Sequence, residues 1–94
     1  MKNLIIDTAT DKIFLKIINN NKEYNIKHDN SRENFVELVN IIFNFLYQNN
    51  INLKEIDNIF VNQGPGKYTS IRSAICIVKA LKISNNINIY GYYS

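Results

Sequence analysis

The sequence predicts an α/β fold in which a mixed five-stranded sheet packs against two main helices. Two observations support this prediction. Five short segments have the apolar character of strands, and two longer segments repeat apolar residues at the helical spacing of three and four positions. These segments follow the order β-β-β-α-β-α-β, and right-handed crossovers then make the first, fourth and fifth strands parallel.

The first third of the chain is expected to form three strands joined as a hairpin meander. Residues 3–7 include three consecutive apolar side chains, which is typical of a buried strand. After a polar turn at residues 8–12, the second strand covers residues 13–18, and the three asparagines at 19–21 favour a hairpin turn. Residues 23–28 alternate between apolar and polar side chains, so one face of the third strand is expected to be solvated.

The first helical segment follows a break at residues 29–32 and runs to about Asn49. Asn30 or Ser31 is suited to cap its N-terminus, because a short polar side chain can accept a hydrogen bond from a free amide of the first turn. Six apolar positions follow the helical rule: Phe35, Leu38, Val39, Ile42, Phe43 and Leu46.

This helix carries more apolar surface than a sheet can cover. Val36 and Tyr47 extend its apolar side in one direction. Ile41 and Phe45 extend it in the other. The apolar arc reaches roughly 240°, whereas a helix lying on a sheet needs little more than ~100°. The excess predicts contact with a second helix, with another lobe or with another chain.

The second half of the chain is expected to add a strand at residues 57–61, a helix over about 69–83 and a final strand at 87–92. Arg72 and Lys79 stand seven positions apart and share one stripe of that helix. Its apolar side is made by Ile71, Ala74, Ile75, Ile77, Val78 and Leu81.

The turn before the second helix has the composition of an anion-binding corner. Gly64 and Gly66 can adopt backbone angles that are closed to other residues. Thr69 or Ser70 is suited to cap the helix, whose free amides favour an anion beside the positive charge of Lys67. The spacing excludes a P-loop, because valine stands where its first glycine belongs and tyrosine follows the lysine.

Length and composition exclude several classes of protein. The 94 residues are enough for one domain, residues 1–94, and a hydrophobic share of 46% is ordinary for a globular protein. The net charge of +3 is spread along the chain and is too diffuse for a nucleic-acid footprint. No apolar run approaches the ~20 residues of a membrane span, and no signal peptide is expected.

The single histidine and the single cysteine argue against metal and hydrolase chemistry. His28 and Cys76 cannot complete a zinc site by themselves, so no metal is expected. His28 has no acidic neighbour at a spacing typical of hydrolases, and Cys76 lies mid-helix among isoleucines, where a thiol is usually inert. The protein is therefore not expected to be a peptidase. One cysteine also forms no internal disulfide, which predicts a cytoplasmic setting.

Two motifs make the chain similar to a known family. Residues 64–72 read GPGKYTSIR, and residues 4–10 read LIIDTAT. Both resemble, in the same order, motifs of the TsaB (YeaZ) family. The resemblance covers essentially the whole chain and corresponds to the first of that family's two lobes. It implies a ribonuclease H-like, actin-like ATPase lobe whose sheet has the strand order 3-2-1-4-5.

The same resemblance implies a function. Members of this family serve as non-catalytic partners and scaffolds of TsaD which, together with the ATPase TsaE, places threonylcarbamoyl on adenosine 37 of tRNA. By this resemblance the chain would contact tRNA indirectly and would form a helix bundle with TsaD or with a second copy, as a heterodimer or a homodimer. The expected interface residues are Phe35, Val36, Val39, Ile42, Phe43, Leu46, Ile71, Arg72, Ile75, Val78 and Lys79.

Two other functions are open at this point. The first is a minimal actin-like nucleotide binder, in which ATP would bind only at an interface shared with partners. Its phosphate turn would use Asp7, Thr8, Gly64, Gly66, Lys67 and Thr69. The turn after Asp7 lacks the glycine of actin-like ATPases, which favours Asp7 as an Asx cap of that turn over a ligand role. The second is direct tRNA binding through Lys67, Arg72 and Lys79, which would weaken strongly with salt.

Overall fold

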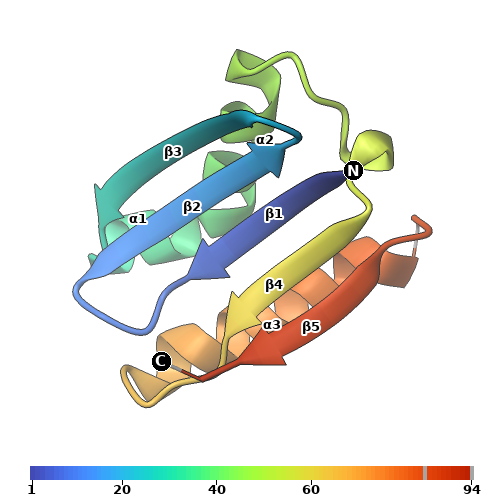
Figure 1. Ribbon diagram of the computed structural model, residues 1–94. Coiled ribbons are helices and arrows are strands. Elements are labelled where there is room, and N and C mark those ends of the chain that lie inside the picture. The colour runs from blue at the N-terminus through green and yellow to red at the C-terminus, as the bar shows by residue number, and fades with distance from the viewer. Residues whose placement is uncertain (84, 94) are drawn as a thin grey trace.

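The computed structural model describes residues 1–83 and 85–93 (Figure 1). Its elements follow the predicted order, except that two helices stand where one was expected and a 3-10 turn is added. They are β1 (Lys2–Asp7), β2 (Lys12–Asn19), β3 (Lys22–Asp29), α1 (Arg32–Val36), α2 (Leu38–Gln48), η1 (Leu53–Glu55), β4 (Asn58–Asn62), α3 (Tyr68–Ile83) and β5 (Asn88–Tyr92).

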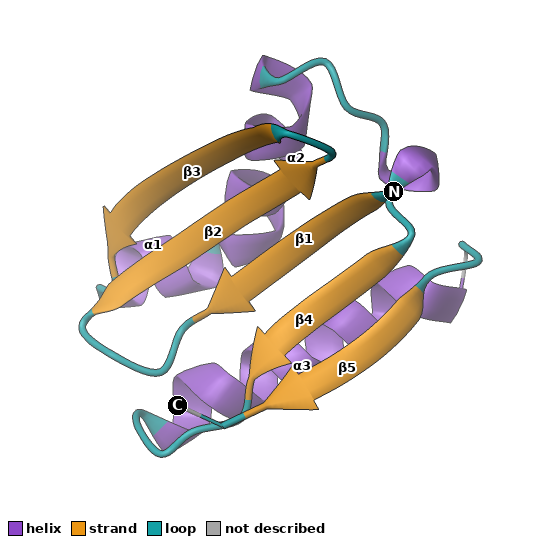
Figure 2. Cartoon of the chain, viewed as in Figure 1, coloured by secondary structure: helices purple, strands orange, loops and turns teal. Residues whose placement is uncertain are grey.

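The strands form a five-stranded sheet in the order β3-β2-β1-β4-β5 within the described residues (Figure 2). The β1–β2 and β2–β3 pairs are antiparallel, whereas the β1–β4 and β4–β5 pairs are parallel. Leu4 lies opposite Ile17 on one side and Ile59 on the other, which places β1 in the middle of the sheet. The predicted strand order and the three parallel strands are therefore confirmed.

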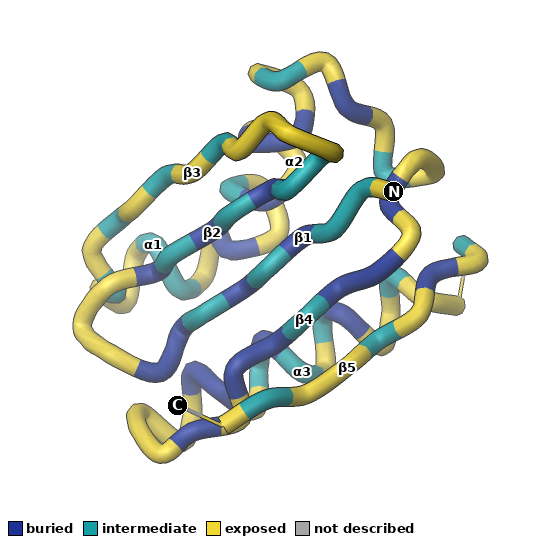
Figure 3. Tube along the Cα trace, viewed as in Figure 1, coloured by how far each residue is buried: buried dark blue, intermediate teal, exposed yellow. Residues whose placement is uncertain are grey.

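The helices lie on one face of the sheet, with α1 and α2 behind the antiparallel half and α3 behind β4 and β5 (Figures 1 and 2). Buried residues alternate with less buried ones along β1 and β2, whereas every residue of β4 except Phe60 is buried (Figure 3). The core between sheet and helices includes Leu4, Ile6, Ile13, Leu15, Ile17, Ile59 and Val61 from the strands and Leu38, Ile42, Phe45, Leu46, Ala74 and Val78 from the helices.

The first predicted helix is divided in two, which corrects the prediction of one continuous helix. Glu37 leaves helical geometry with φ −93° and ψ 13°, and it separates α1 from α2. No proline or glycine marks this break in the sequence. The two pieces have different contacts: the Asn34 side chain of α1 donates to the Asp29 carbonyl at the end of β3 at 2.7 Å, whereas Leu38 at the start of α2 is buried in the core. Helical hydrogen bonds continue on both sides of the break, from the Glu37 amide to the Glu33 carbonyl at 3.2 Å and from the Ile41 amide to the Glu37 carbonyl at 2.9 Å.

The N-terminus of α1 agrees with the prediction, whereas that of α3 differs from it. Ser31 caps α1 by accepting a hydrogen bond from the Asn34 amide at 3.2 Å. Helix α3 begins at Tyr68, so the expected cap at Thr69 or Ser70 is wrong. The Lys67 amide donates to the Ala9 carbonyl at 2.8 Å, and the Lys67 carbonyl accepts the first helical bond from Ile71. This contact with the β1–β2 turn starts the helix one residue early.

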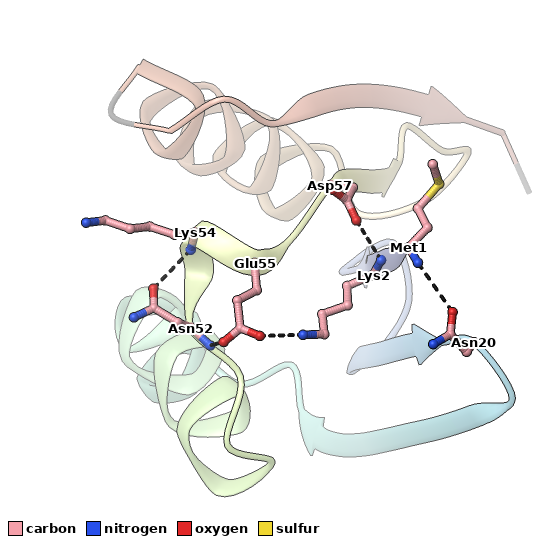
Figure 4. A network of polar contacts seen from close by, with 7 residues as sticks. All are labelled: Met1, Lys2, Asn20, Asn52, Lys54, Glu55 and Asp57. Carbon is pink, nitrogen blue, oxygen red and sulfur yellow. Dashed lines mark hydrogen bonds and ion pairs between the residues drawn. The ribbon is translucent and has the colours of Figure 1, made fainter.

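A polar network holds the start of β1 to the segment that precedes β4 (Figure 4). The Lys2 ammonium bonds the Glu55 carboxylate, and the Lys2 amide donates to Asp57 at 2.8 Å. Glu55 also accepts from the Asn52 amide at 3.0 Å, completing the capping box of the 3-10 turn. The pKa of Glu55 is lowered, first by its hydrogen bond to Lys2 and then by the one to the Asn52 backbone.

Candidate functional site

The structure decides which of the expected interface residues can face a partner. Ile42, Leu46, Ile71 and Val78 are buried against the sheet. These four side chains hold the helices in place, so they are not surface residues in this fold. The others reach the surface fully or in part: Phe35 and Ile75 are half-buried, and Val36, Val39, Phe43, Arg72 and Lys79 are exposed.

The exposed apolar residues of α1 and α2 recur at helical spacing. They are Val36, Val39, Phe43 and Tyr47, at spacings of three, four and four positions. Val36 is 72% exposed, Phe43 42% and Tyr47 82%. We call these four residues the helical stripe. The predicted excess of apolar surface is therefore present on the Val36 and Tyr47 flank.

The opposite flank of the predicted arc is not exposed in the same way. Phe45 is buried, and Ile41 is half-buried against the core. The sheet and the neighbouring elements thus cover one side of α2 and leave the other uncovered. The sequence could show that the arc was too wide, but only the packed structure shows which side remains open.

Helix α3 has a mixed exposed flank at positions 68, 72, 76, 79 and 83. The Arg72 guanidinium lies over the Tyr68 ring, 5.5 Å from its centroid, and donates to the Tyr68 hydroxyl at 3.2 Å. These two residues and Cys76 line a shallow hollow of about 310 Å³. Cys76 lies mid-helix as expected, and its side chain is exposed.

The residues of the predicted phosphate turn do meet at one corner of the fold. Gly64 has φ +115°, which favours glycine, and its amide donates to the Asn62 side chain at 2.8 Å. Gly66 packs against the β1–β2 turn, since a Cβ at Gly66 would lie 2.1 Å from the Ala9 carbonyl oxygen. The two turns that were expected to surround a ligand are in direct contact with each other.

The polar groups at this corner bond to neighbouring groups of the chain. The Asp7 carboxylate accepts from the Ala9 amide at 3.0 Å, which is the Asx cap weighed above. The buried Thr8 hydroxyl donates to the Ser70 carbonyl at 3.0 Å. The Lys67 ammonium donates to the Asn30 carbonyl at 3.5 Å, while Thr69 is exposed. The corner therefore joins β1, β3 and α3 structurally.

Asn30 is the residue at this corner whose role the sequence did not reveal. Its side-chain amide donates to the carbonyls of Thr8 and Thr10, at 3.1 and 2.9 Å, and to the Ser70 hydroxyl at 3.3 Å. Asn30 was a candidate helix cap by composition, but Ser31 caps the helix instead. The sequence signal for Asn30 was its position immediately after β3. That position does not reveal which groups the side chain bonds.

The described part of the chain contains no candidate metal site, because no three of its His, Cys, Asp and Glu side chains are grouped so that they could hold a metal ion. Among the same residues, no helix is both long and apolar enough to cross a membrane.

Comparison with known proteins places the chain in a family. A family model described as TsaD, tRNA N6-adenosine threonylcarbamoyltransferase, matches residues 17–93. The chain belongs to this family.

Curated relatives refine the placement within the TsaD family. A tRNA threonylcarbamoyladenosine biosynthesis protein TsaB of Buchnera aphidicola subsp. Schizaphis graminum is 30% identical over 88 residues, which cover 94% of this chain and 42% of the relative. TsaB of Buchnera aphidicola subsp. Baizongia pistaciae is 25% identical over 84 residues, covering 89% of this chain and 38% of the relative. The resemblance to TsaB is confirmed, and the chain spans about two fifths of the length of these relatives.

A solved structure confirms the fold. YeaZ from Pseudomonas aeruginosa superposes with a TM-score of 0.89 at 21% identity, covering 98% of this chain and 43% of YeaZ. The expected ribonuclease H-like, actin-like lobe with the order 3-2-1-4-5 is therefore confirmed.

Proposed function

We propose that the protein acts in tRNA threonylcarbamoyladenosine biosynthesis as a non-catalytic docking subunit for a catalytic partner of the TsaD family. The observation that supports docking is the helical stripe of Val36, Val39, Phe43 and Tyr47. The family placement and the TsaB relatives support the process. A TsaE-like ATPase and tRNA would then meet the complex in the cytoplasm chiefly through the catalytic partner.

The helical stripe has the geometry of a helix-packing surface. Val39, Phe43 and Tyr47 stand four positions apart in α2 and lie above one another, so they form a ridge that fits a groove on another helix. Val36 of α1 stands before the break at Glu37 and adds an exposed apolar side chain. Burying a large apolar side chain contributes about 1.5–3 kcal/mol. Exposed residues such as Phe43 and Val36 therefore favour association strongly once a partner of matching shape is present.

The family placement favours a related partner. A protein that matches the same family model is expected to present an equivalent helix on the same face of an equivalent sheet. Two such faces can pack around an approximate twofold axis, in the way that identical subunits form isologous dimers. Helix α3 lies on the same face of the sheet as α1 and α2 (Figure 1), so its exposed residues Tyr68 and Arg72 would extend this interface.

The corner where the turn with Gly64 and Gly66 meets the β1–β2 turn supports the non-catalytic part of the proposal. Gly66 occupies the space beside Ala9, and the side chains of Asp7 and Thr8 bond to neighbouring groups of the chain. These contacts give the glycine turn a structural role: they fix α3, and hence its exposed flank, relative to the sheet.

Co-purification with a TsaD-family protein tests the proposal. A glutamate in the stripe would bury a charge in the interface, so Phe43→Glu and Val36→Glu are expected to weaken association by at least about tenfold. The matched control is Asn44→Glu, which adds the same charge to an exposed position of α2 outside the helical stripe. Undiminished association of both stripe variants would rule out docking through this surface.

A further inference from the structure

The two edges of the sheet differ in their protection against pairing with another chain. Strand β3 forms one edge and β5 the other. The β3 edge carries Lys22, Glu23, Lys27 and Asp29, and charged side chains of this kind discourage the addition of a further strand. Strand β5 reads NIYGY, with no charged residue and no proline. One edge of the sheet is therefore protected by charge, and the other is not.

The outer side of β5 presents backbone groups that can pair with a further strand. On its inner side β5 pairs with β4 without interruption, and the Asn88 amide donates to the Asp57 carbonyl at 3.0 Å. Alternate residues of a strand direct their amides and carbonyls to the same side, so those of Ile89 and Gly91 point away from β4. Figure 1 shows no described segment alongside this outer edge. Each of these two residues thus offers a donor and an acceptor to a further strand.

The pattern of outward groups fits a second copy of the same strand. In an antiparallel pair, opposite residues that exchange both hydrogen bonds alternate with opposite residues that exchange none. When Tyr90 stands opposite Tyr90 of a second copy, Ile89 of each copy faces Gly91 of the other, and their outward groups meet. Gly91 also has no side chain to obstruct Ile89 across the junction. A shift of this register by one position would set outward groups against inward ones.

Aromatic rings favour the same register. Tyr90 would lie at the centre of the junction, where opposite residues exchange no hydrogen bonds and their side chains come closest. Its ring stacks on Phe60 of β4, with centroids 5.3 Å apart and an interplanar angle of 22°. Tyr90 is nevertheless 49% exposed, so its ring can also meet Tyr90 of the second copy. Aromatic pairs between neighbouring strands stabilise sheets.

We propose that the outer edge of β5 pairs with the β5 edge of a second copy of this chain, antiparallel and with Tyr90 on the twofold axis. The two sheets then form one continuous sheet, and the axis perpendicular to it keeps the helices of both copies on one face. Helices α1 and α2 lie behind the half of the sheet that is remote from β5 (Figures 1 and 2). The helical stripe therefore stays accessible, and this pairing does not rest on the proposed function.

Light scattering over a range of concentrations tests the pairing with the full 94-residue chain. We expect a dimer that dissociates on dilution. Gly91→Pro is expected to weaken it by at least about tenfold, because proline removes an outward amide from each copy and with it half of the hydrogen bonds between them. Gly91→Ala is the matched control: it also places a Cβ beside Gln63 but keeps the amide, so dimerisation should stay within about twofold.

A second variant keeps the test valid if Gly91→Pro unfolds the chain, which circular dichroism would reveal. Tyr90 is half exposed on the edge strand, so Tyr90→Lys leaves the core of the fold intact. It sets two like charges opposite each other on the axis, and it is also expected to weaken the dimer by at least about tenfold.

Cysteine cross-linking tests the register, in a Cys76→Ser background because Cys76 is exposed. Tyr90→Cys should give a disulfide-linked dimer on air oxidation, since the opposite Cα atoms would lie about 4.5 Å apart, a distance that a disulfide can span. Asn88→Cys is the control: Asn88 would face Tyr92 of the second copy and lie roughly 13 Å from its own counterpart, so it should not link to itself. A mixture of Asn88→Cys and Tyr92→Cys should link.

Three outcomes would overturn the proposal. They are a chain that stays monomeric up to about 1 mM, a dimer that Phe43→Glu dissolves and Gly91→Pro does not, and cross-linking of Asn88→Cys alone without any of Tyr90→Cys. Phe43→Glu changes the helical stripe and is expected to leave the β5 dimer within about twofold. Co-purification with a TsaD-family protein tests the helical stripe separately, so either proposal can fail without the other.

Discussion

Gly66 stands against the backbone of Ala9 so closely that a Cβ on Gly66 would lie 2.1 Å from the Ala9 carbonyl oxygen. The same carbonyl accepts a hydrogen bond from the Lys67 amide at 2.8 Å. The turn that leads into α3 is therefore braced by the turn that follows β1. Helix α3 takes its position on the sheet from this backbone contact.

Gly66→Ala is expected to lower the free energy of unfolding. The new methyl group cannot fit beside Ala9, so the two turns must separate and the hydrogen bond from Lys67 must lengthen or break. Overpacking of this kind costs about 1–3 kcal/mol. Urea denaturation followed by circular dichroism measures the change.

Gly91→Ala provides the matched control. A Cβ at Gly91 would meet the side chain of Gln63 at 2.2 Å, but Gln63 is exposed and its side chain can move aside. The free energy of unfolding should then stay within about 0.5 kcal/mol of the parent value. Equal losses for the two glycine variants would contradict the special role of the contact between Gly66 and Ala9.

Asn30→Ala is expected to loosen the same corner from the side of β3. The substitution removes the donors to Thr8, Thr10 and Ser70. Leaving part-buried acceptors without these donors costs about 1–3 kcal/mol. Asn25→Ala, at an exposed position of β3, is the control and should change the free energy of unfolding far less. The measurement is thermal and urea denaturation, and equal effects of the two variants would argue against Asn30 as a tie between the turns.

Glu55 is expected to make the free energy of unfolding fall at acidic pH. Its pKa is lowered below the ordinary value of 4.5, chiefly by the hydrogen bond to Lys2, so folding favours the charged form. The resulting stabilisation is present above pH 4.5 and is lost as the pH falls through the lower pKa of the folded state. Glu55→Gln should therefore reduce the loss of stability between pH 7 and pH 3. Some loss remains, because Lys12 lowers the pKa of Asp29 in the same way.

A double-mutant cycle checks the assignment of this effect to one pair. In a Lys2→Met background the main cause of the lowered pKa of Glu55 is absent, so Glu55→Gln should change the acid dependence much less. Urea midpoints measured from pH 7 to pH 3 give the four values needed. An undiminished effect of Glu55→Gln in that background would exclude Lys2 as the main partner.

The sheet could be predicted because its signals are local. Tyr24, Ile26 and His28 alternate with polar residues in the sequence, and in the structure they stand opposite Ile17, Leu15 and Ile13 on the core side of β3. One solvated face of β3 was expected on the same pattern, and alternate residues of this strand are exposed. A period of two specifies the face of each residue without knowledge of the partner strands.

The helical surface and the corner could be predicted only in part because their outcome depends on distant segments. Ile42 and Phe43 are adjacent in an apolar arc that is too wide to orient the helix, and only packing on the sheet buries the first and exposes the second. The break at Glu37 has no sequence marker such as proline. Asn30 bonds groups 20 to 40 positions away, which local composition cannot foresee.

The central position of β1 has a consequence for synthesis on the ribosome. The hairpin meander of β1, β2 and β3 can assemble as soon as Asp29 has emerged, but the second edge of β1 pairs with β4, whose Asn58 lies 55 positions after Asn3. Until that segment appears, the nascent chain displays an unpaired strand edge rich in isoleucine, which is a template for aggregation. Newly made chains, rather than finished ones, are thus the form that most needs protection by chaperones.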